Sequence, residues 1–177
     1  MSTRHIVAET ALGELTLVAA GGAVTGVYFR HHVRRPAESS FGERVASDVL
    51  LDEAARQVRA YLAGERRDFE LPLATAGDDV QEAVWTALRE IPYGTTTTYG
   101  ALAERLGFVT SAWGVGRAVG ANPLCVLVPC HRVVGSTGTL TGYAGGLRRK
   151  RFLLDLEAAA DGEPWLPGMG AHRAGAA

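Results

Sequence analysis

One short apolar run, which ends in a proline, a cysteine and a histidine, constrains this chain more than any other feature. Residues 124–128 are continuously apolar, which predicts a short buried segment. Pro129 ends that segment and restricts the backbone directly before Cys130. The thiol is therefore predicted to lie at the end of a buried segment, next to His131 and Arg132. An imidazole and a guanidinium beside a thiol favour the thiolate, which is the form that acts as a nucleophile or a metal ligand.

Other interpretations of the cysteines remain open at this point. A free cysteine is more often a small buried apolar residue, and Cys125 fits that interpretation because it lies inside the apolar run. Cys130 fits it poorly, since His131 and Arg132 are costly to bury without partners. The two cysteines and His131 are too few ligands for a closed zinc site. A disulfide is possible, but the sequence contains no disulfide framework.

The first half of the chain predicts a small sheet and one helix. Residues 5–9, 14–20 and 23–29 alternate as short strands with glycine turns between them. Residues 48–63 have helical apolar spacing, with Ser47 or Asp48 as the N-cap. His31 and His32 have no cysteine or carboxylate beside them, so a solvated loop is favoured over a metal site.

The second half predicts several helices. An apolar stripe begins after Asp78 or Asp79 and runs to Ile91, with Trp85 packing at its border. Residues 99–106 and 112–121 are predicted to form two shorter helices with N-caps at Thr98 and Ser111, in a helix-turn-helix pattern. The second of them is rich in glycine, which indicates close approach either by the first helix or by DNA.

Overall charge does not indicate a nucleic-acid-binding protein. The chain has 177 residues, is 47% hydrophobic and carries a formal net charge of −1. A DNA contact would need a local patch, and residues 148–151 form the densest basic cluster, although such a cluster is more often a solvated helix end. Two cysteines and a start without an apolar run predict a cytoplasmic protein, and no stretch is long enough to span a membrane.

An ordered set of motifs resembles the O6-alkylguanine-DNA alkyltransferases, which are also called methylated-DNA–protein-cysteine methyltransferases. These motifs are Ile91-Pro92-Tyr93-Gly94 through Tyr99-Gly100, Asn122-Pro123, Pro129-Cys130-His131-Arg132-Val133, Gly142-Tyr143-Ala144-Gly145-Gly146-Leu147, and a last helix from Lys150 to Glu157. The resemblance is strong over about residues 78–158 and rests on pattern alone over residues 1–70.

The resemblance implies an α/β (α+β) fold with two domains. A small ribonuclease-H-like sheet domain is expected over residues 1–70, and a helical domain with a helix-turn-helix, which binds DNA and accepts the alkyl group, over residues 78–160. Residues 161–177 are rich in glycine, proline and alanine, and we expect a flexible tail there. Some family members hold zinc through cysteines in the N-terminal half, and this half has none, so no metal is expected.

The resemblance also implies the chemistry, which is irreversible transfer of the alkyl group from O6-alkylguanine, and also from O4-alkylthymine, to Cys130. Each molecule would act once, as a monomer on double-stranded DNA, without a cofactor and without a membrane. The matching catalytic residues are Cys130, His131, Glu157, Tyr99 and Asn122. The residues assigned to substrate and DNA binding are Trp113, Arg117, Arg132, Val133, Tyr143, Ala144, Gly145 and Lys150.

Each catalytic residue takes its role from the resemblance. His131 would accept the thiol proton through a bridging water, and Glu157 would hold the tautomer of that histidine. Tyr99 would support base flipping and protonate N3 of the leaving guanine. Asn122 would bond the turn below the cysteine. Without the resemblance, Glu157 would be interpreted as a surface glutamate, and a core role for Tyr99 would be equally acceptable.

One position departs from the family pattern. The family has an arginine nine positions before the motif asparagine, where it fills the stack after the damaged base is flipped out, and counting back from Asn122 gives Trp113. Arg117 lies four residues later and does not match that position. An indole can stack but carries no charge. This departure leaves two alternatives to DNA repair. The chain could be a damage sensor with weak or no transfer, or an enzyme that acts on a small alkylated molecule. A further departure is Ala144, where the family often has serine.

Overall fold

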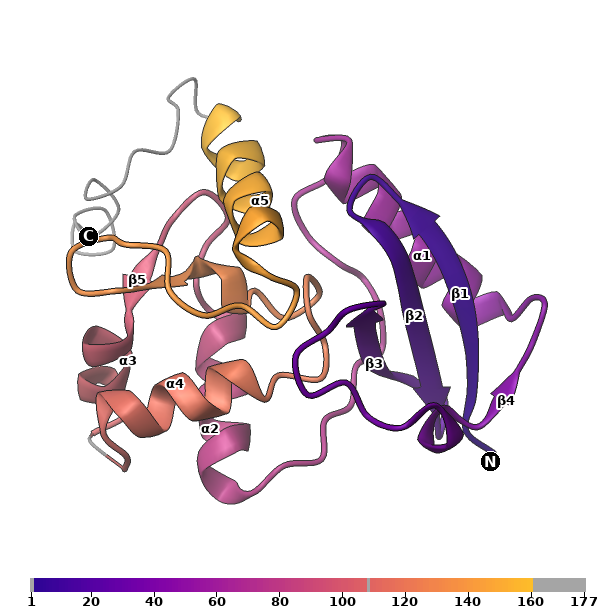
Figure 1. Ribbon diagram of the computed structural model, residues 1–177, viewed down its shortest axis with the longest axis horizontal. Coiled ribbons are helices and arrows are strands. Elements are labelled where there is room, and N and C mark those ends of the chain that lie inside the picture. Colours follow the sequence, from indigo (N-terminus) through magenta and orange to yellow (C-terminus); the bar gives the residue numbers. More distant parts are fainter. Residues whose placement is uncertain (1, 108, 161–177) are drawn as a thin grey trace. The chain divides into compact units, whose positions relative to one another are not determined.

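The computed structural model describes residues 2–107 and 109–160, and these divide into two compact units (Figure 1). Among the described residues, the first unit comprises residues 2–75 and Pro123–Leu127, and the second comprises residues 76–107, 109–122 and 128–160. The expected flexible tail over residues 161–177 lies outside the described residues. No helix within the described ranges is both long and apolar enough to cross a membrane.

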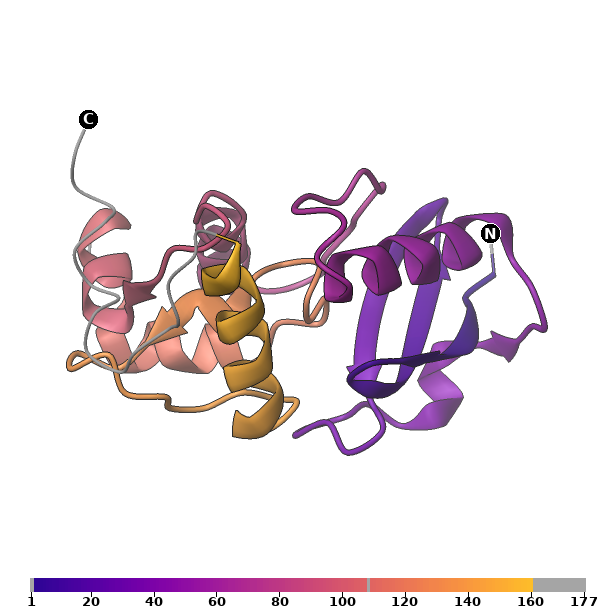
Figure 2. The ribbon, with the colours of Figure 1, turned by 90° about the horizontal axis from the view of Figure 1, so that it is seen from above.

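The first unit contains a four-stranded sheet with the order β3-β2-β1-β4 and one α-helix. Its elements are β1 (Arg4–Thr10), β2 (Gly13–Ala20), β3 (Ala23–Phe29), the 3-10 helix η1 (Glu38–Phe41), β4 (Glu43–Arg44) and α1 (Val49–Leu62). The three predicted strands are confirmed as an antiparallel meander, and β4 adds to β1 in parallel. The predicted helix is also confirmed, with Asp48 as its N-cap. Figures 1 and 2 show α1 lying along one face of this sheet.

The sheet is covered on both faces, which is why β2 is buried along most of its length. Leu15 and Leu17 pair with Phe29 and Val27 across β2 and β3, and all four side chains share the face that α1 covers. On the other face, Arg35 donates a hydrogen bond to Thr16 Oγ1 at 3.0 Å, and the Phe41 ring stacks on Tyr28 at 5.2 Å. The loop after β3 therefore closes the second face.

The prediction of a solvated loop at His31 and His32 is wrong for His32. His31 is exposed, whereas His32 is buried with its ring edge-on to Tyr28 at 5.2 Å. Burial, followed by the charge of Arg35, lowers the pKa of His32 to about 4. Within residues 2–107 and 109–160, no group of three or more His, Cys, Asp or Glu side chains is placed to hold a metal ion.

The apolar run before the cysteine is buried, as predicted, but its first part packs with the first unit. Val27 N donates to the Pro123 carbonyl at 2.8 Å, and Leu124 forms a parallel bridge with Val27 at the free edge of β3. The expected domain boundaries had placed this whole segment in the C-terminal domain. The chain then turns at Val126, whose φ of +74° is rare for a β-branched residue. This turn separates the segment on β3 from the segment that carries Cys130.

The second unit consists of short helices around one parallel pair of two-residue strands. Its elements are α2 (Asp79–Arg89), β5 (Thr97–Thr98), α3 (Tyr99–Arg105), α4 (Ala112–Gly120), the 3-10 helix η2 (Cys130–Arg132), β6 (Val133–Val134) and α5 (Leu147–Ala159). The predicted N-caps are confirmed at Asp78, which forms a capping box with Gln81, and at Thr98 and Ser111. Trp85 is buried and donates its indole N–H to the Ala118 carbonyl at 2.8 Å, which joins α2 to α4.

The glycines of α4 have different surroundings. A Cβ built on Gly114 would lie 1.8 Å from Thr110 Oγ1, so a side chain at this position would have to displace the Thr110 hydroxyl in the loop that precedes the helix. A Cβ on Gly116 would meet the Tyr99 ring at 3.7 Å, which is ordinary contact, and one on Gly120 would meet nothing within 4 Å. Close packing within the unit therefore explains Gly114, while the surface at Gly120 is open.

Candidate active site

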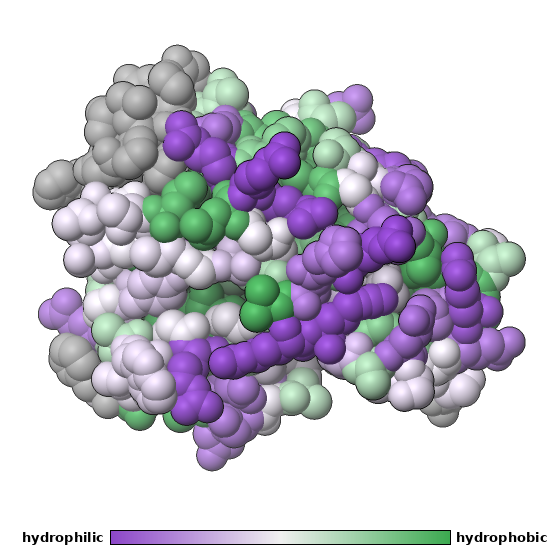
Figure 3. All heavy atoms as spheres, in the orientation of Figure 1, coloured by the Kyte–Doolittle hydropathy of each residue, from purple (hydrophilic) through white to green (hydrophobic). Residues whose placement is uncertain are grey.

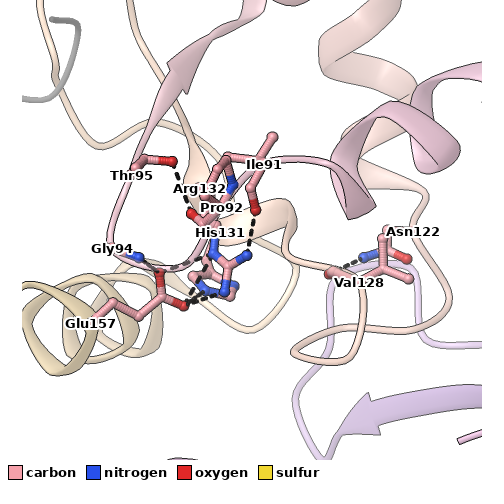
Figure 4. A network of polar contacts seen from close by, with 9 residues as sticks. All are labelled: Ile91, Pro92, Gly94, Thr95, Asn122, Val128, His131, Arg132 and Glu157. Atoms are coloured by element: carbon pink, nitrogen blue, oxygen red, sulfur yellow. Dashed lines mark hydrogen bonds and ion pairs between the residues drawn. The ribbon is translucent and has the colours of Figure 1, made fainter. Parts of the chain in front are cut away.

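Cys130 lies on a tight backbone turn at the start of η2. Pro129 has φ −80° and ψ 62°, which is an inverse γ-turn, and Cys130 N donates to the Val128 carbonyl at 2.8 Å. Asn122 Nδ2 donates to the same carbonyl at 3.0 Å (Figure 4). The turn is thus held from both sides, in the manner that the resemblance implied for Asn122. The Cys130 side chain is 3% exposed, so this thiol has little contact with solvent.

The residue after the cysteine, His131, forms a buried pair with Glu157 from α5. His131 Nε2 lies 2.6 Å from Glu157 Oε1, and both residues are at most 1% exposed. Gly94 N donates to Glu157 Oε2 at 3.1 Å (Figure 4). The structure therefore brings together the cysteine, the histidine and the glutamate of the predicted catalytic set, and the interpretation of Glu157 as a surface residue does not hold.

The electrostatics of this pair define the tautomer of the histidine. Burial lowers the pKa of His131, and the negative charge of Glu157 offsets this only in part. Burial alone would raise the pKa of Glu157, but His131 and Arg132 outweigh it and hold that pKa at about 2. At neutral pH the carboxylate can only accept, so Nε2 of the neutral imidazole must donate to it. The lone pair then lies on Nδ1, which makes His131 a proton acceptor.

The structure places Arg132 inside the unit instead of on a DNA-binding surface. Its guanidinium donates from Nε to Glu157 Oε2 at 2.9 Å and from Nη2 to Oε1 at 3.0 Å, and Nη1 donates to the Ile91 carbonyl at 2.6 Å (Figure 4). It also lies 5.6 Å above the Tyr93 ring. Arg132 was predicted to bind DNA directly, but these internal partners occupy its guanidinium in the structure.

Lys150 is likewise buried, although it was predicted to contact DNA from the basic end of the last helix. Its ammonium donates to the carbonyls of Val133 at 2.6 Å, Thr141 at 2.7 Å and Gly142 at 3.1 Å. Burial lowers the pKa of Lys150 to about 8, while the negative charge of Cys130 acts in the opposite direction. Since such an interaction is mutual, a largely protonated Lys150 favours the thiolate form of Cys130. Only its neighbours Arg148 and Arg151 are exposed.

Tyr99 and the loop before α5 lie beside this thiol. Tyr99 begins α3, and its hydroxyl donates to the Thr141 carbonyl at 3.1 Å. Burial, and to a smaller extent the charge of Cys130, raises the pKa of Tyr99, so its hydroxyl keeps its proton at neutral pH. Tyr143, Ala144 and Gly145 follow as a buried stretch of the same loop. The loop predicted to form the pocket wall is therefore connected to both Tyr99 and Lys150.

The residues of α4 that were assigned to DNA binding are placed differently from this buried group. Trp113 is 72% exposed, and the Arg117 guanidinium lies 5.0 Å above its ring. Figure 3 shows pale residues of intermediate hydropathy beside strongly hydrophilic ones over the part of the second unit that contains α3 and α4. The side chains of Trp113 and Arg117 are exposed to a binding partner, whereas Cys130 is buried.

Sequence reasoning missed the backbone groups that complete the site. The Ile91 carbonyl and the Gly94 N–H hold Arg132 and Glu157, and the Thr141 carbonyl holds Tyr99 and Lys150. Gly94 carries a local signal, because its φ of +77° requires a residue that tolerates the left-handed region. The carbonyls carry no side-chain signal, so only the fold reveals them.

Comparisons with known families match both units. Residues 3–75 match the family described as 6-O-methylguanine DNA methyltransferase, ribonuclease-like domain. Residues 79–159 match the one described as 6-O-methylguanine DNA methyltransferase, DNA binding domain. The N-terminal match agrees with the ribonuclease-like fold that the resemblance implied.

Individual proteins and structures give the same result. A methylated-DNA–protein-cysteine methyltransferase from Mycobacterium bovis is 40% identical over 149 residues, which are 84% of this chain and 88% of that protein. An inducible protein of the same name from Bacillus subtilis is 46% identical over 123 residues, or 70% of this chain and 69% of that protein. The crystal structure of Mycobacterium tuberculosis OGT in complex with DNA superposes with a TM-score of 0.79 at 38% identity, and covers 88% of this chain and 93% of that one.

Proposed function

The chain belongs to the 6-O-methylguanine DNA methyltransferase family, and we propose that it repairs alkylated DNA by moving the alkyl group from O6 of guanine to Cys130. The observation that carries this proposal is the buried arrangement of Cys130 beside a neutral His131 that is held by the Glu157 carboxylate. A nucleophile, a base and a group that orients the base are the elements of thiol activation. The relatives named above support the DNA substrate.

The transfer step balances with these residues alone. His131 Nδ1 takes the thiol proton through a bridging water, and the Cys130 thiolate attacks the alkyl carbon that is bonded to O6. The new S–C bond forms while the C–O6 bond breaks, and its electron pair stays on the guanine. Tyr99, which keeps its proton at neutral pH, donates it to N3 of the leaving guanine. The proton gained by His131 balances the one lost by Tyr99, so the products are guanine and a thioether.

The substrate base must leave the duplex, because its O6 atom cannot be reached inside the stack. The loop of Tyr143, Ala144 and Gly145 provides the pocket wall, with backbone N–H groups in place of the serine that the family often has at position 144. The Val133 carbonyl accepts from Lys150 and retains a second lone pair for the exocyclic amino group of guanine. The same chemistry extends to O4-alkylthymine, which carries its alkyl group on an equivalent ring oxygen.

The reaction is expected to stop after one event per protein molecule, because the thioether has no leaving group that returns the thiol. With excess O6-methylguanine duplex, restored guanine should rise to one equivalent of protein and then stay constant, without any added cofactor. Digestion of the DNA and chromatography of the nucleosides measures this plateau. Continued turnover beyond one equivalent would contradict a suicidal reaction, and no restored guanine would contradict the proposed function.

A second candidate function is supported by Trp113, which replaces the arginine of the family pattern. A sensor would bind alkylated duplex without restoring guanine, and an enzyme for a small alkylated molecule would bind no DNA. The plateau experiment distinguishes repair from these two alternatives, because neither of them restores guanine. A parallel measurement of duplex affinity then distinguishes the sensor from the enzyme for a small molecule. If the protein binds DNA, its affinity for the duplex should decrease as the salt concentration rises. Phosphate contacts release counterions from the DNA, and this release is less favourable at high salt.

We expect Lys150→Met to slow alkyl transfer by about tenfold or more, since a tenfold change corresponds to about 1.4 kcal/mol. Methionine keeps most of the length of the side chain but removes the charge that favours the thiolate, and it leaves the carbonyls of Val133, Thr141 and Gly142 without this donor. Single-turnover rates with O6-methylguanine duplex measure the effect. Arg148→Met, on the exposed part of the same helix, is the matched control and should keep the parent rate. Equal rates for Lys150→Met and the parent protein would remove Lys150 from the reaction.

A further inference from the structure

The loop over residues 141–146, which leads into α5, is rich in glycine and is held by side chains. Gly142 and Gly146 have φ angles of +50° and +89°, in a region that suits glycine and few other residues. Because glycine gives the backbone more freedom, such a loop keeps one conformation only where contacts fix it. At the start of the loop, the ammonium of Lys150 donates to the carbonyls of Thr141 and Gly142.

Arg149 holds the other end of this loop. Its Nη1 donates to the Gly145 carbonyl at 2.9 Å, in a partly buried position. The N–H of Gly146 donates to the Tyr143 carbonyl, also at 2.9 Å. The peptide group between Gly145 and Gly146 is therefore bonded through both its C=O and its N–H. Since Arg149 and Lys150 are consecutive residues of α5, the first turns of one helix fix the loop at both ends.

The stretch between these two ends is the proposed pocket wall. Tyr143 and Ala144 are buried there, at 8% and 7% exposure. Alanine has no hydroxyl, so the donors that this stretch can offer to O6 of guanine are backbone N–H groups. A backbone donor cannot be redirected by a change of rotamer, because its direction depends on the conformation of the whole loop. Donors of this kind stabilise developing charge only where they are already in place.

We propose that Arg149 is a positioning residue for alkyl transfer, which fixes the Gly145 carbonyl and thereby holds the backbone N–H groups of the pocket wall toward O6 of the extruded guanine. This inference rests on the proposed function, because it assumes that the base lies against this loop. Arg149 touches none of the reacting atoms. Its effect is on the guanine, since negative charge develops there as the C–O6 bond breaks. Lys150, the next residue, acts instead on the thiolate of Cys130.

Two substitutions of Arg149 test the hydrogen bond to Gly145. Arg149→Met keeps most of the length of the side chain but has no donor, and it should slow single-turnover transfer from a saturating O6-methylguanine duplex by roughly tenfold to a hundredfold. Arg149→Lys should recover most of the parent rate, because one carbonyl acceptor needs only one donor. Arg148→Met removes the same charge from the adjacent exposed position and should keep the parent rate.

A second measurement separates positioning from general disruption of the unit. Iodoacetamide alkylates a thiolate without any guanine, and peptide mapping distinguishes its reaction at Cys130 from reaction at Cys125. Arg149→Met should react with iodoacetamide at Cys130 at the parent rate, since Lys150 and His131 remain beside the thiol. A substitution that disturbed the whole site would change the rates of both reactions.

The outcomes distinguish this inference from the function on which it rests. A parent protein whose Cys130 reacts with iodoacetamide but takes no methyl group from the duplex would contradict the proposed function, and this inference with it. Normal transfer by the parent protein, with Arg149→Met at the parent rate or slowed equally toward both reagents, would overturn the positioning role alone. The same conclusion would follow if Arg149→Lys were as slow as Arg149→Met.

Discussion

Glu157→Ala should lower the free energy of unfolding by about 3–5 kcal/mol, which is the usual cost of removing one partner from a buried ion pair. The variant would leave the Arg132 guanidinium and the Nε2 group of His131 buried without their acceptor, together with the Gly94 N–H. Such a loss is a large part of the stability of a small protein, about 5–15 kcal/mol. Urea unfolding of parent and variant at neutral pH measures the difference.

The matched control is Glu53→Ala. Glu53 also pairs with an arginine, since Arg56 Nη2 lies 2.6 Å from its Oε1, but this pair is on the surface of α1. Solvent screens exposed pairs, which contribute little to stability, so this variant should unfold close to the parent protein. If Glu157→Ala proved no more costly than Glu53→Ala, the buried network would not have the structural weight that its contacts indicate.

The same network predicts how stability depends on pH. Stability decreases on acidification wherever the unfolded chain binds more protons than the folded chain. The folded pKa of His131 lies below its ordinary 6.5, and that of Glu157 is about 2 against an ordinary 4.5. The contribution of this buried pair to stability should therefore be complete above pH 6.5, fall as His131 becomes protonated only in the unfolded chain, and fall further between pH 4.5 and about 2. Glu157→Gln should make the second decrease smaller without abolishing it, because the pKa values of Asp48 and Glu53 are lowered as well. An unchanged acid profile would contradict the assignment.

Cys130→Ser should reduce transfer to the uncatalysed background, which is the largest change expected of any single substitution. A serine hydroxyl is a far weaker nucleophile than a thiolate at neutral pH, and the charge of Lys150 cannot compensate for this difference. Affinity for O6-methylguanine duplex should persist, because the substitution changes one atom of a side chain that is 3% exposed. Nucleoside analysis after incubation, with duplex binding measured in parallel, checks both expectations.

Cys125→Ala is the control for this substitution. Cys125 is fully buried in the first unit, and its removal should leave the transfer rate unchanged at temperatures where the variant is folded. Loss of transfer in Cys125→Ala with normal folding, or normal transfer in Cys130→Ser, would show that the acceptor has been assigned to the wrong cysteine.

Local chemistry made much of the fold predictable. The caps at Asp48, Asp78, Thr98 and Ser111 lie where predicted, because a capping side chain bonds N–H groups two or three residues away. The strands of the first unit follow from alternating side chains and glycine turns. The pairing of Thr97 and Thr98 with β6 was missed, since two residues give no periodic signal and their partners are distant in sequence.

The site was only partly predictable, for a related reason. Cys130 could be identified because His131 and Arg132 follow it directly in the sequence. The burial of Arg132, in contrast, depends on Glu157, which is 25 residues away. Lys150 lies in a run of basic residues, and the carbonyls of Val133 and of the loop before α5 hold its side chain inside the unit. A charged residue whose partners are backbone groups of another segment looks identical, in sequence, to one that faces solvent.

The most direct test of the central claim is the mass of the intact parent protein after incubation with a duplex that carries one O6-methylguanine, followed by peptide mapping. The predicted result is a gain of one methyl group per molecule, which is located on the peptide that contains Cys130 and is absent from every other peptide. An unmodified protein that still binds the duplex, or a methyl group on any other residue, would contradict alkyl transfer to Cys130.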